Sequence, residues 1–178
     1  LDAVTFFLSA FLLRRVDAPS DVPHRGPRQS VATEIGEGLR LVRHNRTLLA
    51  LAWLAGLWQL LHDMQVAVLI LLATRELGLS AGAIGIAYMF GGLGCVLAAA
   101  SAERLSARLG VGPVIVYGLL FTAIAWQAFG LIAGSVAFAT VALGLTMLTF
   151  DFGGVLFGIN YLALRQAITP DRLLGRMT

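Results

Sequence analysis

The chain has 178 residues, of which 58% are hydrophobic and only 13% are charged, and its formal net charge is +3. A globular protein has about 25% charged residues, so this chain has too few polar groups to cover a soluble particle of its size. The composition therefore excludes a secreted or cytosolic enzyme and a nucleic-acid-binding protein, and it predicts an all-α integral membrane protein.

The first part of the chain is predicted to contain the end of a helix and then a linker. Residues 1–13 are apolar but shorter than the roughly 20 residues that a crossing helix needs, and no basic region precedes them. We therefore expect them to be the end of a transmembrane helix. Residues 14–46 are predicted to be a proline-containing linker followed, from about Thr33, by an amphipathic surface helix. In that helix Ile35 and Leu39 share a face.

Four long apolar segments follow, and each exceeds the roughly 18 residues that indicate a membrane-spanning helix. Backbone groups in lipid must be hydrogen-bonded within the segment, so the segments are predicted to be helices. Their connections are short, which predicts that consecutive helices lie antiparallel and adjacent. The segments cover residues 47–164 and run at about 47–73, 81–102, 113–133 and 136–164.

Small residues spaced four apart predict where these helices approach one another closely, because small side chains let two backbones come together in lipid. Three such sets occur, namely Gly94–Ala98–Ala102, Gly130–Gly134 and Gly154–Gly158.

The arginines alternate between the two sides of the predicted bundle. Residues 14–46 contain seven of the thirteen Arg, residues 103–112 contain two and residues 165–178 contain three, whereas the opposite side has only Arg75. The positive-inside rule places the three Arg-rich segments in the cytoplasm. The chain has no Lys, a bias typical of GC-rich bacterial genomes, so we expect a multi-pass protein of the bacterial inner membrane. The alternation also explains the positive charge without a nucleic-acid partner.

A few polar residues fall inside the predicted spans. Gln59, His62 and Asp63 stand at i, i+3 and i+4, which predicts one helical face near the middle of the first span. Asp151 lies near the middle of the fourth span, and Asn160 follows about two and a half turns later. Ionisable groups at this depth are costly and tend to face a cavity or a partner. We expect these five residues to contribute to cargo binding or proton coupling; the alternatives are that the acids pair with structural partners on absent helices or lie nearer the membrane interface.

Other chemistry has less support. A metal site at His62 and Asp63 would need further ligands, and none follows at ligand spacing, so no metal and no cofactor is expected. The single cysteine, Cys95, cannot form a disulfide within the chain. Tryptophans at 53, 58 and 126 could stack on an aromatic cargo, but tryptophans in membranes usually pack or anchor.

Four segments resemble the second half of a Major Facilitator Superfamily transporter. They are EGLRLVRHNRTL (37–48), ATRELGLSAGAIG (73–85), AERLSARLGVGP (102–113) and INYLALRQAITPDRLLGRMT (159–178). The branch that they resemble includes enterobactin-exporter-like and macrolide-efflux-like proteins. The resemblance implies a partial helical bundle: the end of helix six, the central cytoplasmic loop, complete helices seven to ten, and a truncated loop after helix ten. It also implies that the first half and the last two helices of the protein are missing.

By this resemblance, several residues belong to the cytoplasmic loop motifs of the family. These are Glu103, Arg104, Arg108, Arg165, Gln166, Asp171 and Arg176. Glu103 stands where the family usually has Asp, and the customary Gly ahead of it is Ala or Ser. The family places helices seven and ten beside a central cavity, which would put Asp63 and Asp151 on cavity-lining helices.

The expected function is proton-driven export of a small organic molecule, such as a drug or siderophore, by alternating access. The expected partners are the lipid bilayer, the cargo, protons and the missing parts of the same protein, and no enzymatic activity is expected. Three rivals remain: a membrane subunit of a primary transporter, a membrane-embedded enzyme, and a scaffold or receptor that transports nothing. Cargo, direction, coupling ion and oligomeric state stay open.

Overall fold

A computed structural model describes residues 2–13 and 31–169. The chain divides at Thr33 into two compact units, and each is described by itself. The first contains helix α1 (Asp2–Leu13), which confirms that this apolar segment is helical. The predicted linker of residues 14–30 lies outside the described residues, as does the tail from residue 170.

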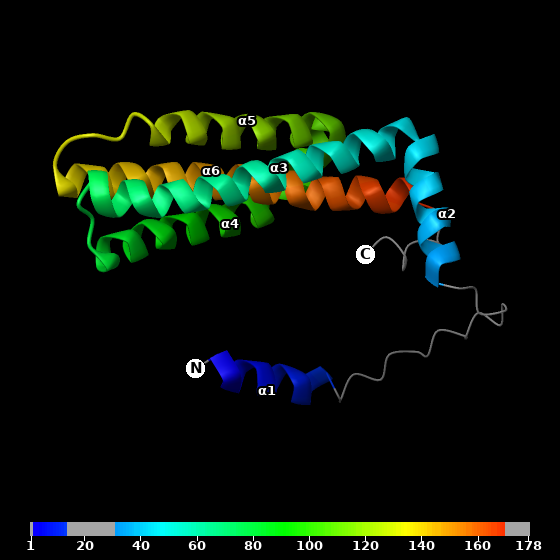
Figure 1. Ribbon diagram of the computed structural model, residues 1–178, viewed down its shortest axis with the longest axis horizontal. Helices are drawn as coiled ribbons and strands as arrows, with labels where there is room; N and C mark the ends of the chain where they lie inside the picture. Colours follow the sequence, from blue (N-terminus) through cyan, green and yellow to red (C-terminus); the bar gives the residue numbers. More distant parts are fainter. Residues whose placement is uncertain (1, 14–30, 170–178) are drawn as a thin grey trace. The chain divides into compact units, whose positions relative to one another are not determined.

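All regular structure in the described residues is helical, as predicted (Figure 1). After α2 (Val31–His44), the chain forms α3 (Arg46–Leu71), a π-helical turn η1 (Leu72–Glu76), α4 (Ala81–Leu109), α5 (Val111–Phe129) and α6 (Val136–Ile168). Four stretches are long and apolar enough to cross a membrane: α3 with η1 over 31 residues, α4 over 29, α5 over 19 and α6 over 33. The number of complete spans in the described residues therefore agrees with the prediction.

Residues 103–112 are not the loop that the sequence predicted. The α4 helix continues through Leu109, and α5 begins at Val111, so the break between them is Gly110 alone. Gly110 has a φ of 88°, a left-handed conformation that glycine adopts without strain. Its amide donates a hydrogen bond to the carbonyl oxygen of Ser106 at 2.9 Å, which closes the last turn of α4. The helix thus ends at the residue that can reverse the backbone.

Side chains cap the starts of the other long helices. Oδ1 of Asn45 accepts hydrogen bonds from the amides of Thr47 and Leu48 at 3.0 and 3.2 Å, which fixes the first turn of α3. Ser80 caps α4 and Ser135 caps α6 in the same way. These caps satisfy amides that would otherwise have no partner at the first turn.

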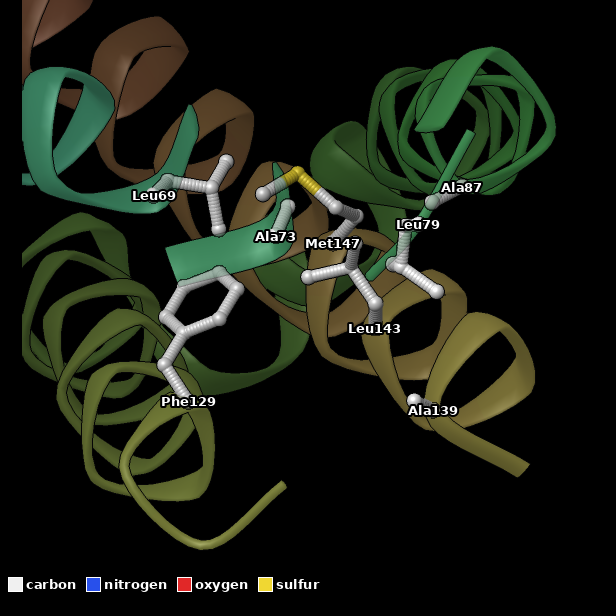
Figure 2. Packing of buried hydrophobic residues seen from close by; sticks show 8 residues of the cluster. All are labelled: Leu69, Ala73, Leu79, Ala87, Phe129, Ala139, Leu143 and Met147. Carbon is white, nitrogen blue, oxygen red and sulfur yellow. The ribbon is translucent and has the colours of Figure 1, made fainter. Parts of the chain in front are cut away.

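The turn after α3 is compact. The amide of Leu77 donates to the carbonyl of Leu72 at 3.0 Å, and that of Leu79 donates to the carbonyl of Ala73 at 2.9 Å. Gly78, with a φ of 60°, allows the chain to reverse between them. This arrangement directs Ala73 and Leu79 into a cluster of buried residues, where they meet the start of α6 and the ends of the neighbouring helices (Figure 2).

The α6 helix is the centre of the bundle and the most buried of the four spans. Consecutive long helices run antiparallel, as predicted (Figure 1). The predicted adjacency of consecutive helices is wrong for α4, however, because α4 packs mainly against α6 and much less against α5. The α5 helix also packs along α6. The α3 helix is the least buried span, and it touches α6 over a small area.

Glycines bring α4 and α5 close to α6. A side chain on Gly94 of α4 would collide with the carbonyl oxygen of Leu148, and Ala98 and Ala102 are buried on the same face. On α5, a Cβ atom at Gly118 would lie 2.7 Å from the carbonyl oxygen of Gly153. The prediction of close packing is confirmed for the set that begins at Gly94.

The other two predicted sets make no such approach. A Cβ atom at Gly158 would have nothing within 4 Å, and one at Gly154 would touch only the ring of Trp58 at 3.4 Å. At Gly130 the nearest atom is the carbonyl oxygen of Gln127, on the same helix, and Gly134 meets Phe138 at 3.5 Å. The close contact on α6 is made by the neighbouring Gly153, which faces α5.

Replacing Gly118 by Ala should destabilise the bundle. The added methyl would overlap the backbone of α6 and force α5 outward, which we expect to cost about 1–3 kcal/mol. The measurement is the free energy of unfolding in detergent micelles. Gly158→Ala is the matched control, because its methyl enters open space and gains helix propensity of up to about 1 kcal/mol. Equal stabilities of the two variants would contradict the close α5–α6 contact.

Candidate functional site

Four aromatic side chains form a column that links three helices; we call it the ring column. The indole of Trp58 stacks on the imidazole of His62, one turn later on α3, with ring centroids 5.2 Å apart and planes 2° apart. His62 stacks on Phe150 of α6 at 5.4 Å and 9°, and Phe150 lies over Trp126 of α5 at 6.3 Å and 14°. The column therefore connects α3 to α5 through α6.

The ring column holds three buried nitrogen atoms that have no hydrogen-bond partner among the described residues. They are Nε1 of Trp58, Nε1 of Trp126 and Nδ1 of His62. An unsatisfied polar group in an apolar interior costs about 1–3 kcal/mol, so proteins rarely keep one without a use. The column thus combines flat apolar rings with unused hydrogen-bonding capacity.

Asp151 follows Phe150 on α6 and lies beside the column. Its carboxylate points at α4, where it packs directly against Gly91, so that a side chain at Gly91 would collide with Oδ2. The carboxylate also interacts electrostatically with His62 of α3 and with Cys95 of α4. Asp151 is half-buried, and it lies where α3, α4 and α6 meet.

The three residues predicted to share one face of α3, Gln59, His62 and Asp63, lie in two different environments. His62 is half-buried and packs into the ring column, whereas Gln59 and Asp63 are exposed. Gln59 Nε2 donates to Oδ1 of Asp63 at 3.1 Å, so the two exposed side chains form a pair one turn apart. Asp63 lies near the middle of the 31-residue stretch Arg46–Glu76. A carboxylate near the middle of a membrane-spanning helix needs water or a polar partner, and Gln59 is one such partner.

Asn160 does not join this group. It is 2% exposed, and its Oδ1 lies 2.6 Å from the hydroxyl oxygen of Ser106 on α4. Its Nδ2 donates to the carbonyl of Leu156 at 2.9 Å. Asn160 follows Asp151 by nine residues, a rise of about 14 Å along α6. In the structure Asn160 links α4 to α6.

The residues of the predicted loop motifs lie at helix ends. Glu103, Arg104 and Arg108 are exposed on the last turns of α4. Arg165 and Gln166 lie on the last turn of α6, where the guanidinium of Arg165 is 6.0 Å from the ring centre of Tyr161. Asp171 and Arg176 fall outside the described residues.

Sequence reasoning missed three contributors to this site: Gly91, Phe150 and the role of Trp126. The stacking of Trp58 on His62 could have been predicted, because the two residues stand at i and i+4, the spacing that brings side chains together on a helix. The contacts of Phe150 and Gly91 join different helices, and nothing in their local sequence indicates them. Within the residues that the structure covers, no three His, Cys, Asp or Glu side chains cluster as a metal site would require.

Replacing Gly91 by Ala should displace the carboxylate of Asp151. The new methyl would occupy the position of the carboxylate, which we expect to destabilise the α4–α6 pair by about 1–3 kcal/mol. Adding Asp151→Ala to this variant removes the obstruction and should restore most of the lost stability. Unfolding of the single and double variants in detergent measures the coupling.

The matched control for this cycle is Gly92→Ala, because a Cβ atom at Gly92 would have nothing within 4 Å. It should leave the stability near that of the parent and show no coupling to Asp151. If the effects of Gly91→Ala and Asp151→Ala simply add, within about 0.5 kcal/mol, the two residues are not in contact.

Comparison with known proteins found no match to this chain among family models, curated proteins or solved structures.

Proposed function

We propose that the chain is part of a secondary active transporter that exports a small organic molecule in exchange for protons, and that it corresponds to the second half of a Major Facilitator Superfamily protein. One observation supports transport above all: Asp151 lies beside the ring column and interacts with His62, a member of that column, between helices long and apolar enough to cross a membrane. Ionisable groups at such depth are costly and typically mark a substrate or ion pathway.

Asp151 and His62 are the proposed proton-handling groups. A carboxylate and an imidazole can both bind and release protons. His62 belongs to α3 and Asp151 to α6, so a change in their proton occupancy changes the attraction between two helices. Asp63, on the outer face of α3, would serve as the second acidic group of the pathway.

The limited packing of α3 supports the proposal that this helix shifts during transport. Alternating access requires one group of helices to shift against another around the binding site. The α3 helix is the least buried span, and its contact with α6 depends on Trp58 and His62. Trp58 packs over Gly154, where a Cβ atom would lie 3.4 Å from the indole, and its ring centroid is 5.6 Å from that of Phe157. A few ring contacts can be exchanged more easily than a long helix interface.

The ring column is also the proposed cargo-binding surface. Its aromatic faces suit a flat organic molecule, and the unsatisfied indole N–H groups of Trp58 and Trp126 would donate to acceptors on that molecule once a shift of α3 uncovers them. We propose a bacterial plasma membrane, with Arg104, Arg108 and Arg165 on the cytoplasmic side, because Arg-rich segments alternate along the sequence with segments that have few arginines.

The test is drug or dye efflux from proteoliposomes that contain the product of the complete reading frame, driven by an imposed pH gradient. Asp63→Asn and Asp151→Asn should each reduce gradient-driven efflux to near the background of empty vesicles, because neither amide can carry a proton. Glu76→Gln, which changes an exposed acid at the end of the same stretch as Asp63, should leave efflux unchanged. Full coupled efflux in both Asp variants would disprove the coupling, and a requirement for ATP would favour a primary transporter.

A second arm tests the relation to a larger transporter. Proteoliposomes that contain residues 1–178 alone should show no efflux, since half of an alternating-access bundle cannot enclose a cargo on both sides. Robust efflux by this chain alone would overturn the proposal that it is half of a transporter.

A further inference from the structure

The second half of α4 carries a face that begins with apolar residues and ends with two arginines interleaved with leucines. One surface hollow is lined, among the described residues, by Leu97, Ala100, Ser101, Arg104, Leu105, Arg108 and Leu109. Their spacing of three and four residues places them on one side of the helix. We call this surface the α4 face. Most of its side chains are exposed, so packing among the described helices does not explain them.

The α4 helix is longer than the hydrocarbon core of a membrane is thick, so one of its ends extends beyond the core. With 29 residues, the helix is about 44 Å long at 1.5 Å per residue. The hydrocarbon core is about 30 Å thick, which equals about 20 helical residues. Counted from the cap at Ser80, the core ends near Ala102. Leu97 and Ala100 therefore lie at the level of acyl chains, and Arg104 and Arg108 lie at the level of phospholipid headgroups.

The charge of the face is unbalanced. Arg104 and Arg108 stand one turn apart, a spacing at which like charges repel and weaken a helix. Both are exposed, and neither forms an ion pair with an acidic side chain in the described part of the chain. Each guanidinium presents a planar fork of N–H groups that matches the oxygens of a phosphate, and both line the same hollow. The electrostatics thus favour an anion with several oxygens.

We propose that the α4 face binds a phospholipid with an anionic headgroup. The phosphate lies between the guanidinium groups of Arg104 and Arg108, and an acyl chain lies along Leu97 and Ala100. Basic surfaces at the membrane interface attract anionic lipids in this way. The face is separate from the ring column, since Arg104 is thirteen residues, or about 20 Å of helix, from Gly91. The inference does not depend on transport.

Two features favour a lipid over other occupants. A free phosphate ion would contact the arginines but not the apolar residues of the face. A protein segment would need to bring an acid to the arginines, whereas a phospholipid carries its anion and its apolar chain in one molecule. The arginines therefore suit the headgroup of a lipid, and the apolar residues that precede Arg104 suit its acyl chain.

The test is native mass spectrometry of the full chain, released from nanodiscs that contain equal amounts of phosphatidylglycerol and phosphatidylcholine. The parent chain should retain one phosphatidylglycerol in preference to phosphatidylcholine. Arg104→Gln combined with Arg108→Gln should lower that preference at least about tenfold. Arg40→Gln combined with Arg43→Gln makes the same change in net charge on exposed residues of α2 and should preserve it. If both double variants lost this preference equally, the preference would depend on net charge alone and the proposal would be overturned.

Two further arms separate the occupants. Ala100→Trp leaves the charge unchanged but fills the acyl part of the face, and it should also weaken retention of phosphatidylglycerol. Excess inorganic phosphate should not displace the lipid. Displacement by phosphate, undiminished retention in Ala100→Trp, or a bound protein in place of lipid would each contradict the proposal. Circular dichroism confirms that each variant is folded.

Discussion

The structure depends on the close approach of two helices to α6. In lipid the hydrophobic effect does little to hold helices together, so their association depends on van der Waals contact and hydrogen bonds between them. Gly94 lets α4 reach the backbone of α6 at Leu148, and Gly118 lets α5 reach it at Gly153. The hydrogen bond between Ser106 and Asn160 adds a polar link between α4 and α6. These contacts make α4, α5 and α6 one packed body.

The position of α3 depends on how α4 and α5 pack against α6. The α4 and α5 helices make most of the contacts of α6, and the contact of α3 with α6 is narrow. Large rings fill it: Trp58 and His62 reach across to Phe150 and Phe157. Further along, the turn after η1 holds the end of α3 through Ala73 and Leu79 (Figure 2). The helix is thus fixed at one end and held by stacking in the middle.

This difference in packing explains where the polar groups are found. The rigid contact between α4 and α6 places the carboxylate of Asp151 against Gly91, where few other residues would leave room for it. The looser contact with α3 brings His62 to the same place from another helix. Asp63, which accepts a hydrogen bond from Gln59, and the arginines of α4 lie on surfaces that the bundle leaves exposed. The polar groups therefore fall into two sets: Asp151 and His62 between the helices, and Asp63 and the arginines of α4 on the surface.

The sequence by itself determined that this chain is helical and that four of its helices can cross a membrane, because hydrophobic length and internal hydrogen bonding depend only on local residues. It also located the polar residues within the spans and the small-residue set that begins at Gly94. Only the tertiary structure decided that α4 packs on α6 and not chiefly on its neighbour in sequence, that Gly153 and not Gly154 makes the close contact, and that His62 parts from Gln59 and Asp63. These outcomes depend on the rotation of each helix about its axis, which is set by how whole surfaces fit together and which no local pattern contains.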